Sequence, residues 1–454
     1  MSSPAERGRW SSRLGFVLAA AGSAVGLGNI WKFPYITGEN GGGFFVIIYI
    51  ACVALVGLPV MAAEILMGRA SQRSPVGAFR ALGGDQPLFN GVGWMGVVAS
   101  VVILSYYSVV AGWALHYTWL SASGTLADMA PGAISRLFGR LYISPGPNLF
   151  WHFVFMGITV AVVWGGVHRG IERWARILMP TMFAALLVML VFVIRLPGFD
   201  PALDFVFGAH AEKLTAASVL EALGHAFFTL SLGMGCMLTY GSYFERDGDA
   251  VAAAIAIGVL DSLVALLACM VLFPITFTHG MQPAAGPGLV FKGVPLALSA
   301  LPGGALLTAI FFALLVFAAL TSAISLLEVA TASLIDERGW PRRRAAGTMG
   351  AVIAVLGIPS ALSGGTQLFG EALERSIGRN FFDTFDYLAS NWMLPLGSLG
   401  TALLVGYRMD AALRHEEFAR GSSLGRLYRA WLGLLRYAVP VGMTLVFLHA
   451  LGAF

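Results

Sequence analysis

Long runs of apolar residues, separated by short polar segments, recur along the whole chain. An α-helix needs about 20 mostly apolar residues to cross the hydrocarbon core of a membrane. By this measure the pattern predicts eleven membrane-spanning helices. They are Leu14–Gly38, Gly42–Leu66, Gly91–Leu120, Phe150–Val167, Ile177–Leu196, Leu220–Tyr243, Val251–Phe277, Ala305–Leu334, Ala345–Ile358, Phe382–Tyr407 and Trp431–Leu451.

Two of these runs contain glycine pairs where a membrane helix should be continuous. They are Gly22–Asn29 in the first span and Thr229–Gly235 in the sixth. Glycine in a helix interior costs about 1 kcal/mol relative to alanine, and the flanking Ser, Thr and Asn offer other hydrogen bonds to the backbone. Such sequences also allow close helix packing. Because the two interruptions are matched and flanked by polar residues, they favour broken helices around a binding site at the membrane midplane.

The composition supports a membrane protein and excludes an ordinary soluble enzyme. Hydrophobic residues make up 57% of the 454 positions and charged residues only 11%, whereas a soluble domain carries about 25% charged residues. The net charge of +4 is small, so nucleic acid is not an expected partner. The three cysteines lie inside apolar runs, which predicts packing residues and no disulfide framework.

The arginines indicate the orientation. No cleavable signal peptide is expected, because Met1–Ser12 is polar and the first apolar run lacks a cleavage site. If the N-terminus is cytoplasmic, 19 of the 28 Lys and Arg residues fall on the cytoplasmic side and seven outside. Positive loops are retained in the cytoplasm. The N-terminus is therefore predicted inside and the C-terminus outside.

Motifs of other membrane-protein classes are missing from the sequence. No lysine follows a GxxxxG pattern and no HExxH occurs, so neither a P-loop ATPase nor a zinc protease is indicated. A GxSxG match at Gly421–Gly425 lies in an arginine-rich segment without a preceding strand, which argues against a nucleophile elbow. The chain is not expected to be an enzyme.

Long motifs in the first, sixth and eighth spans resemble those of the neurotransmitter:sodium symporter family. They are Arg13–Gly15, Ala24–Pro34, Glu39–Gly43, Phe227–Gly233 and Ala319–Ser322. The resemblance implies an all-α polytopic protein with the LeuT-type fold, in which helices 1 and 6 are unwound. One transporter domain would span residues 1–454, with inverted repeats at about 10–196 and 215–408 and an extra helix at about 430–452. Many relatives have a twelfth helix, which this chain lacks.

Two sodium sites are implied by the same resemblance. Unwound carbonyls, hydroxyls and amides suit a dehydrated sodium ion. Sodium site 1 would use Ala24, Asn29, Thr229 and Asp261. Sodium site 2 would use the carbonyls of Gly22, Val25 and Ala318 with the hydroxyls of Thr321 and Ser322.

Asp261 departs from the family pattern, which usually has Asn at this position. An ionisable residue in an apolar run is costly and indicates function. Chloride-independent members carry a carboxylate one helical turn later, where Ala265 stands here. Asp261 and Ala265 share one helix face. We therefore expect Asp261 to supply the negative charge directly, without chloride.

The substrate is inferred from the residue at position 26. Monoamine transporters place Asp there, whereas Gly26 leaves the carboxylate to the substrate. An α-amino acid would bind through its carboxylate to Leu27, Gly28 and Tyr107, and through its amine to Ala24, Phe228, Thr229 and Ser231. The side-chain pocket would include Ile103, Phe228, Met234, Ser322 and Leu326. This lining is apolar, which favours aliphatic or aromatic side chains.

Gates on both sides are also implied by the resemblance. Lys32 and Asp386 match an outer ion pair, with lysine in place of the usual arginine. Arg7, Trp10, Tyr243 and Asp336 match the cytoplasmic gate. Glu64 resembles a carboxylate that holds the unwound backbone. Gly170 and Pro180 resemble a segment of helix 5 that unwinds to admit water.

The sequence thus predicts a sodium-coupled symporter of hydrophobic or aromatic L-α-amino acids in a prokaryotic plasma membrane. It would bind two sodium ions, no chloride and no nucleic acid. Two alternatives stay open: a transporter of another small zwitterion, such as betaine, taurine or a γ-amino acid, and an amino-acid sensor that does not transport. The preferred amino acid, the sodium stoichiometry and the oligomeric state are left open by the sequence.

Overall fold

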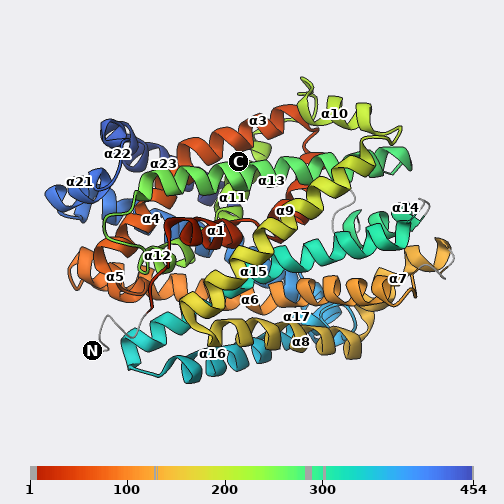
Figure 1. The fold of residues 1–454 in the computed structure, drawn as a ribbon, viewed down its shortest axis with the longest axis horizontal. Helices are drawn as coiled ribbons and strands as arrows, with labels where there is room; N and C mark the ends of the chain where they lie inside the picture. Colours follow the sequence, from red (N-terminus) through yellow and green to blue (C-terminus); the bar gives the residue numbers. More distant parts are fainter. Residues whose placement is uncertain (1–7, 127–128, 130, 282–288, 300–302, 452–454) are drawn as a thin grey trace.

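The structure is a bundle of long helices running roughly side by side (Figure 1). It is a computed structural model that describes residues 8–126, 129, 131–281, 289–299 and 303–451. Within these ranges every regular element is a helix. The long apolar runs account for this, because a backbone in lipid must satisfy its hydrogen bonds within its own segment.

The first half of the chain supplies five spans and their connecting helices. Three of the five contain a π-helical turn, at η1, η2 and η3. The elements are α1 (Arg13–Ala24), η1 (Gly28–Lys32), α2 (Phe33–Glu39), α3 (Gly43–Cys52), η2 (Val53–Gly57), α4 (Leu58–Ser71), α5 (Pro75–Gly83), α6 (Pro87–Ala122), α7 (Pro131–Ile143), α8 (Pro145–Trp164), η3 (Val167–Glu172) and α9 (Arg173–Val193).

The second half contains the remaining spans. A short helix, α10, connects the halves, and α21 is a short helix before the last span. The elements are α10 (Phe199–Phe207), α11 (Ala216–Thr229), α12 (Cys236–Gly241), α13 (Ala250–Thr278), η4 (Leu289–Gly293), α14 (Val294–Ser299), α15 (Gly304–Arg338), α16 (Arg342–Leu356), α17 (Ile358–Leu362), η5 (Gln367–Glu371), α18 (Ala372–Ile377), α19 (Phe381–Leu388), η6 (Ala389–Met393), α20 (Leu394–Leu403), η7 (Leu404–Arg408), α21 (Ala411–Ala419), η8 (Gly425–Leu427), α22 (Tyr428–Gly433), η9 (Leu434–Ala438) and α23 (Val439–Ala450).

Ten of the eleven predicted spans are matched by helices of suitable length and composition among the described residues. Nine are continuous, and the tenth is the bent pair Arg13–Ala24 and Gly28–Glu39. The predicted sixth span, Leu220–Tyr243, corresponds to α11 and α12, which are separated by Leu230–Gly235 and are each too short to cross a bilayer alone. The total of eleven therefore depends on counting α11 and α12 as one interrupted span.

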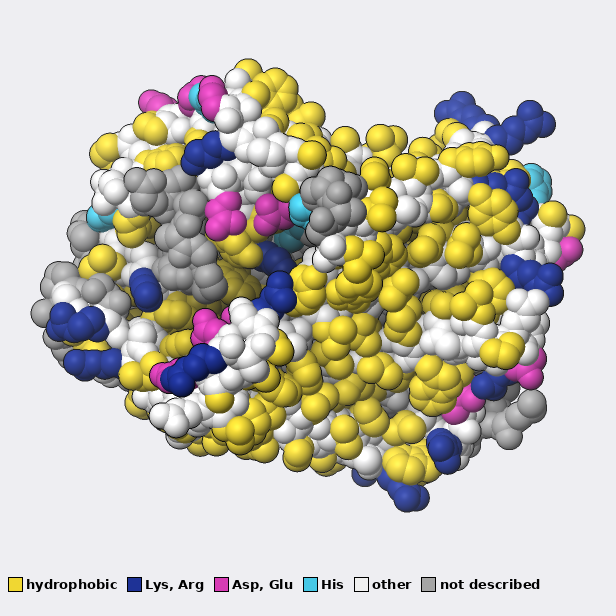
Figure 2. Space-filling model, turned by 180° about the vertical axis from the view of Figure 1, so that it is seen from behind, with side chains coloured by type: hydrophobic (Ala, Val, Ile, Leu, Met, Phe, Trp, Pro, Cys, Tyr) yellow, Lys and Arg dark blue, Asp and Glu magenta, His cyan; other side chains and the backbone are white. Residues whose placement is uncertain are grey.

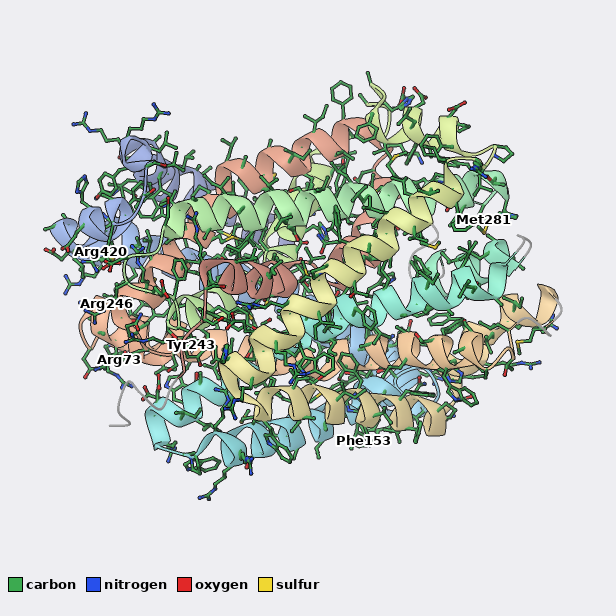
Figure 3. The ribbon with its side chains drawn as sticks, viewed as in Figure 1. Arg73, Phe153, Tyr243, Arg246, Met281 and Arg420 are labelled. Carbon is green, nitrogen blue, oxygen red and sulfur yellow. The ribbon has the colours of Figure 1, made fainter. Side chains whose placement is uncertain are left out.

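The surface reflects a membrane environment. A broad apolar region covers the middle of the molecule, and charged side chains gather toward its two ends (Figure 2). Helices α5, α21 and α22 lie at one end and α7, α10 and α14 at the other (Figure 1). Arg73, Arg246, Arg420 and Tyr243 lie at the first of these ends, which we call the arginine-rich end, and Met281 lies at the opposite end (Figure 3). An apolar belt between two polar ends is the surface expected of a protein that is embedded in a bilayer.

Helix α1 packs against α9, α13 and α15, while α11 packs against α3, α20 and α23, and α12 packs against α4 and α15. The two longest helices, α6 and α15, pack along each other. The polar residues of both broken spans are buried in this interior, including Ser23, Asn29 and Thr229. Buried polar groups need hydrogen-bonding or ligand partners, so the interior of the bundle is where a binding site is expected.

Candidate functional site

The first span breaks between Ala24 and Gly28. Val25 has an extended backbone (φ −72°, ψ 102°), and the two halves of the span are bent by 47°. The Gly26 amide donates a hydrogen bond to Asn29 Oδ1 at 2.9 Å. The glycine and Asn residues of the motif therefore do what the sequence predicts: they release the helix and replace one of its hydrogen bonds with a side chain.

The sixth span breaks over a longer stretch, from Leu230 to Gly235. Ser231, Gly233 and Gly235 all have positive φ (54°, 76° and 78°), and Ser231 is one of only two described non-glycine residues with this backbone. The Gly233 amide donates to Glu64 Oε1 at 2.8 Å. A Cβ at Gly233 would lie 2.2 Å from the carbonyl oxygen of Leu394 in α20. This break is thus held from outside by α4 and α20.

A small pocket of about 20 Å³ lies between the two breaks. Six of its twelve lining residues lie on α6, α11 and α15, and the other six lie in the two breaks and the adjoining ends of α1 and η1. The lining is Ser23, Ala24, Gly26, Gly28, Ile103, Tyr107, Phe228, Thr229, Ser231, Met234, Ser322 and Leu326. It includes every residue predicted for the substrate site except Leu27, whose backbone is adjacent. Ser23 was not predicted.

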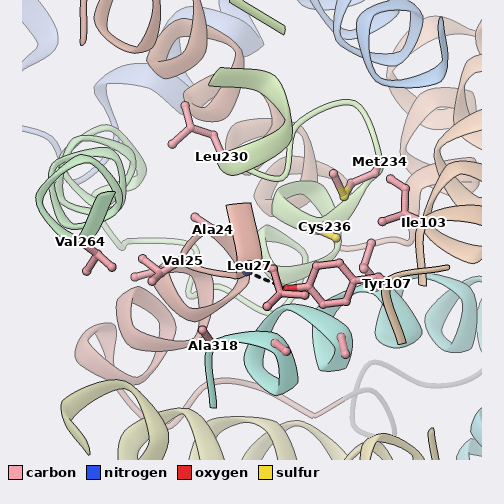
Figure 4. Packing of buried hydrophobic residues seen from close by; sticks show 14 of the residues in the cluster. Ala24, Val25, Leu27, Ile103, Tyr107, Leu230, Met234, Cys236, Val264 and Ala318 are labelled. Atoms are coloured by element: carbon pink, nitrogen blue, oxygen red, sulfur yellow. Dashed lines mark hydrogen bonds between the residues drawn. The ribbon is translucent and has the colours of Figure 1, made fainter. Parts of the chain in front are cut away.

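Backbone groups of the first break are bound by hydroxyls around this pocket. The Leu27 amide donates to the Tyr107 hydroxyl at 3.1 Å (Figure 4). The carbonyl oxygen of Ser23 accepts from Ser231 Oγ at 2.8 Å and from Ser322 Oγ at 3.0 Å. The two breaks and α15 therefore meet at one carbonyl. None of the lining side chains is charged, so polar recognition here comes from hydroxyls and backbone groups.

The residues predicted for sodium site 1 form a hydrogen-bonded cluster around Asp261. Asp261 Oδ1 accepts from Asn29 Nδ2 at 2.8 Å and from Thr229 Oγ1 at 3.0 Å, and Oδ2 accepts from Tyr49 at 3.0 Å. Asp261 is fully buried. Ala24 lines the adjoining pocket. Tyr49 was missed, because its apolar run gives no sign that it faces a residue 212 positions away.

The residues predicted for sodium site 2 lie where α1 meets α15. Ser322 Oγ is 3.4 Å from the carbonyl oxygens of both Gly22 and Ala318. Thr321 Oγ1 donates to the Ala318 carbonyl at 3.0 Å, and a Cβ at Gly22 would lie 3.1 Å from Thr321 Cβ. Val25 lies buried in the break itself. Carbonyls and hydroxyls without a carboxylate are a ligand set that suits sodium.

The predicted outer pair is also brought together. Lys32 Nζ lies 3.6 Å from Asp386 Oδ2 and 4.9 Å from the centre of the Phe228 ring. Tyr106 donates to the same carboxylate at 3.0 Å. Lys32, Phe228 and Asp386 line a cavity of about 350 Å³ on the side of the pocket away from the arginine-rich end. Phe228 lines both spaces, so it separates this cavity from the pocket.

At the arginine-rich end, Trp10 closes the bundle. Its indole nitrogen donates to the Tyr240 carbonyl at 2.9 Å, and the side chain is buried. Tyr243 donates to Glu328, which pairs with Arg342. Asp336 accepts from the Ser74 amide at 2.7 Å. Arg7, the predicted partner in this gate, lies outside the described residues.

These motifs match a family model over most of the chain. The model of the sodium:neurotransmitter symporter family covers residues 7–130 and 144–439. The chain belongs to this family. The symporter is 37% identical to the uncharacterized sodium-dependent transporter YhdH of Bacillus subtilis, with 98% of each chain covered. It is also 26% identical to the human sodium- and chloride-dependent GABA transporter 2, over 98% of this chain and 80% of that protein.

A solved structure extends the likeness to the fold. The symporter resembles the crystal structure of MhsT in complex with L-phenylalanine, with a TM-score of 0.90 and 41% identity over 97% of this chain and 99% of that one. The protein is therefore a sodium-dependent transporter with the LeuT-type fold, in which the first and sixth helices are interrupted. The predicted family and fold class are confirmed.

Proposed function

We propose that this protein is a sodium-coupled symporter of hydrophobic and aromatic L-α-amino acids that works by alternating access without chloride. The observation that carries the proposal is the pocket between the two broken helices, whose lining has hydroxyls and backbone groups but no charged side chain. A substrate held there has to bring both of its own charges. A zwitterion with adjacent amine and carboxylate groups meets this requirement.

The two ends of the zwitterion would meet different partners. The carboxylate would accept from the amides of Leu27 and Gly28 and from Tyr107, at the free amide end of the second half-helix, where anions are favoured. Binding would replace the present bond between Leu27 and Tyr107. The amine would donate to carbonyls of Ala24, Phe228 and Thr229 and to Ser231 Oγ.

The side chain would lie against Ile103, Phe228, Met234 and Leu326. These residues favour an apolar side chain, and the likeness to MhsT, whose structure contains L-phenylalanine, supports an aromatic one. The pocket of about 20 Å³ holds no more than one or two water molecules. The site must therefore widen to accept a ring. Met234, between two glycines with positive φ, is the flexible side chain best placed to move.

Two sodium ions would be coupled to this substrate. The first would bind beside Asp261 with Ala24, Asn29 and Thr229, and the second between α1 and α15 with Gly22, Val25, Ala318, Thr321 and Ser322. Asp261 balances the first charge without a bound anion. Lys32 with Asp386 would close the outer side, and Trp10, Tyr243, Asp336 and Arg7 the inner side.

The protein would lie in the plasma membrane with its N-terminus in the cytoplasm and its C-terminus outside. Arg73, Arg246 and Arg420 gather at one end of the bundle, which supports a cytoplasmic assignment for that end (Figure 3). Cysteines introduced at Arg420 and at Met281 should be labelled from opposite sides of an intact membrane. Labelling of both positions from outside would reject this orientation.

The proposed function is tested by uptake into proteoliposomes. Labelled L-phenylalanine, L-tryptophan and L-leucine are offered with an inward sodium gradient or with choline in place of sodium. Accumulation only with sodium is the expected result. Binding that needs sodium but gives no accumulation would favour a sensor. Competition by betaine, taurine or a γ-amino acid, with none by the three amino acids, would overturn the substrate assignment.

Uptake should be unchanged when gluconate replaces chloride on both sides of the membrane. The reason is that the Asp261 carboxylate already supplies the negative charge beside the first sodium. Initial rates of sodium-driven phenylalanine uptake in the two salts are expected to agree within about twofold, since no charge contribution is lost. A rate that falls to background in gluconate would contradict this prediction.

A further inference from the structure

A cavity of about 320 Å³ opens on the surface of the bundle where η3 passes into α9. Its lining is His168, Arg169, Glu172, Arg173, Arg176 and Ile177. It lies at the arginine-rich end, because Glu172 accepts from the amide of Ser11, the residue that follows Trp10. The pocket between the two broken helices shares none of these lining residues. The surface cavity, which we call the arginine cavity, is therefore a separate space.

The arginine cavity carries positive charge that the protein does not neutralise. Its lining contains three arginines and one carboxylate, which gives a net charge of +2 when His168 is counted as neutral. Arg169 and Arg173 are exposed, and neither forms a salt bridge within the part of the chain that the structure describes. Guanidinium groups that converge on a cavity are suited to an anion with several oxygens, such as a phosphate.

The single carboxylate of the arginine cavity already has partners. Glu172 is only 1% exposed, and its Oε2 accepts from the Ser11 amide at 2.9 Å and lies 3.1 Å from His168 Nδ1. Its Oε1 accepts from Arg176 Nη2 at 2.6 Å. Arg176 is nevertheless 43% exposed. Glu172 thus fixes one of the three arginines and leaves the other two to an external anion.

Two exposed tryptophans place the arginine cavity at the level of the lipid headgroups. Trp174, on α9, and Trp164, at the end of α8, are 41% and 49% exposed. Tryptophan is enriched at the boundary between the hydrocarbon core and water. Trp174 directly follows Arg173, so the cavity meets the edge of the apolar belt. Its arginines therefore lie where lipid phosphate groups are found.

An apolar stripe leads away from the arginine cavity along α9, which crosses the bundle obliquely (Figure 1). Ile177, Ala184, Val188 and Val191 are exposed, and their spacing places them on one face of the helix. Thr181 lies between them, but its hydroxyl donates to the Ile177 carbonyl at 2.7 Å. The stretch from Ile177 to Val188 is about 17 Å long, close to the thickness of about 15 Å for one leaflet of the hydrocarbon core.

We propose that the arginine cavity binds the phosphate group of an anionic phospholipid, with an acyl chain of this lipid lying along the apolar stripe of α9. Arg169 and Arg173 donate to the phosphate oxygens, and Ile177 contacts the start of the chain. A zwitterionic phospholipid brings a cation of its own, which the arginines repel, so the site prefers a lipid with net negative charge. A free phosphate ion shares the headgroup chemistry but makes no use of the stripe. The site is independent of the proposed substrate and sodium ions.

Native mass spectrometry of the detergent-solubilised full-length protein tests this proposal. Dioleoylphosphatidylglycerol, which is anionic, and dioleoylphosphatidylcholine, which is zwitterionic, are titrated separately. The wild-type protein is expected to bind its first phosphatidylglycerol molecule about tenfold or more tightly than phosphatidylcholine. The variant Arg169→Gln/Arg173→Gln should lose about 10- to 30-fold in phosphatidylglycerol affinity, because it removes two cations that lie near the membrane surface.

The matched control is Arg426→Gln/Arg429→Gln. It removes two exposed arginines from η8 and α22, which also lie at the arginine-rich end but do not line the cavity. Its phosphatidylglycerol affinity should stay within about threefold of the wild-type value. Equal binding of the two lipids by the wild-type protein, or equal losses in the two double variants, would overturn the proposal in favour of unspecific attraction. Inorganic phosphate should not displace the lipid, and displacement by it would show a site for soluble anions instead.

Cross-linking locates the lipid without any variant. A phosphatidylglycerol with a photoreactive group in its acyl chain should label residues 177–191 of the wild-type protein. The same label on phosphatidylcholine should react there about tenfold less, because the arginines do not retain that headgroup. Labelling by phosphatidylglycerol that falls only on other helices, or that is equal for the two lipids at residues 177–191, would reject the site.

Discussion

An Asp261→Asn variant is expected to lose about 10- to 100-fold in apparent sodium affinity when chloride is absent. Asp261 is fully buried and gathers donors from Asn29, Thr229 and Tyr49. A hydrogen bond to a charged group contributes about 1.5–3 kcal/mol, and each 1.4 kcal/mol is tenfold in affinity. The asparagine side chain would also place an N–H donor beside Asn29, Thr229 and Tyr49, which already donate hydrogen bonds to this position. The measurement is the sodium dependence of phenylalanine uptake in gluconate.

Chloride should restore much of the lost affinity in this variant. Without the carboxylate, the hydroxyls of Tyr49 and Thr229 are free to donate to an anion in its place. The matched control is the double variant Asp261→Asn/Ala265→Glu, which moves the carboxylate by one helical turn on the same buried face of α13. It should transport without chloride. If Asp261→Asn keeps wild-type sodium affinity in gluconate, the assigned role of Asp261 is wrong.

The second large effect is expected at Gly26. A Cβ there would lie 2.5 Å from Ser322 Oγ and 2.8 Å from the Tyr107 hydroxyl, both at the pocket. Overpacking of this kind costs about 1–3 kcal/mol, so Gly26→Ala should weaken phenylalanine binding by about 5- to 100-fold. Gly26→Asp adds a carboxylate beside that of the substrate, and like charges brought together cost several kcal/mol. Its phenylalanine binding should fall about 1000-fold or more.

Equilibrium binding of labelled phenylalanine at saturating sodium measures both variants. Gly28→Ala is the matched control, because its Cβ would lie 3.3 Å from the Phe228 ring and 3.7 Å from Thr229 Oγ1, and it should lose less than about tenfold. In Gly26→Asp, the affinity for phenylethylamine, which has no carboxylate, should rise relative to the affinity for phenylalanine. Equal losses for the two ligands would show that the carboxylate does not lie near residue 26.

Much of the fold could be predicted from the sequence because membrane helices leave a local signal. The length of each apolar run and the positions of Gly26, Gly28, Gly233 and Gly235 are enough to expect a bundle with two broken helices. The pocket residues on α6 and α15 could not be placed in this way. Ile103 and Leu326 look like core or lipid-facing residues, and only the likeness to a known family indicated that they face the breaks.

Residues whose role depends on a distant partner were the ones that the sequence did not reveal. Tyr49 has no local feature that distinguishes it from its apolar neighbours, yet it donates to Asp261 across the bundle. Ser23 is one hydroxyl in a small-residue segment, yet its carbonyl accepts from Ser231 in the sixth-span break and from Ser322 in α15. Glu172 stands between Arg169 and Arg173 with no local feature that sets it apart, yet it accepts hydrogen bonds from Ser11, 161 positions away. Tertiary packing decides such contacts, and hydrophobic periodicity carries no information about them.

The interruption of the sixth helix bears on how the substrate range of such proteins diverges. Met234 lies between Gly233 and Gly235, and the carbonyl oxygen of Gly233 is so close to α20 that a Cβ at Gly397 would lie 2.1 Å from it. The shape of the segment that faces the substrate's side chain is thus set partly by a helix that does not line the pocket. Mutations in α20 can therefore retune the substrate range during evolution while every residue that touches the amino acid stays the same.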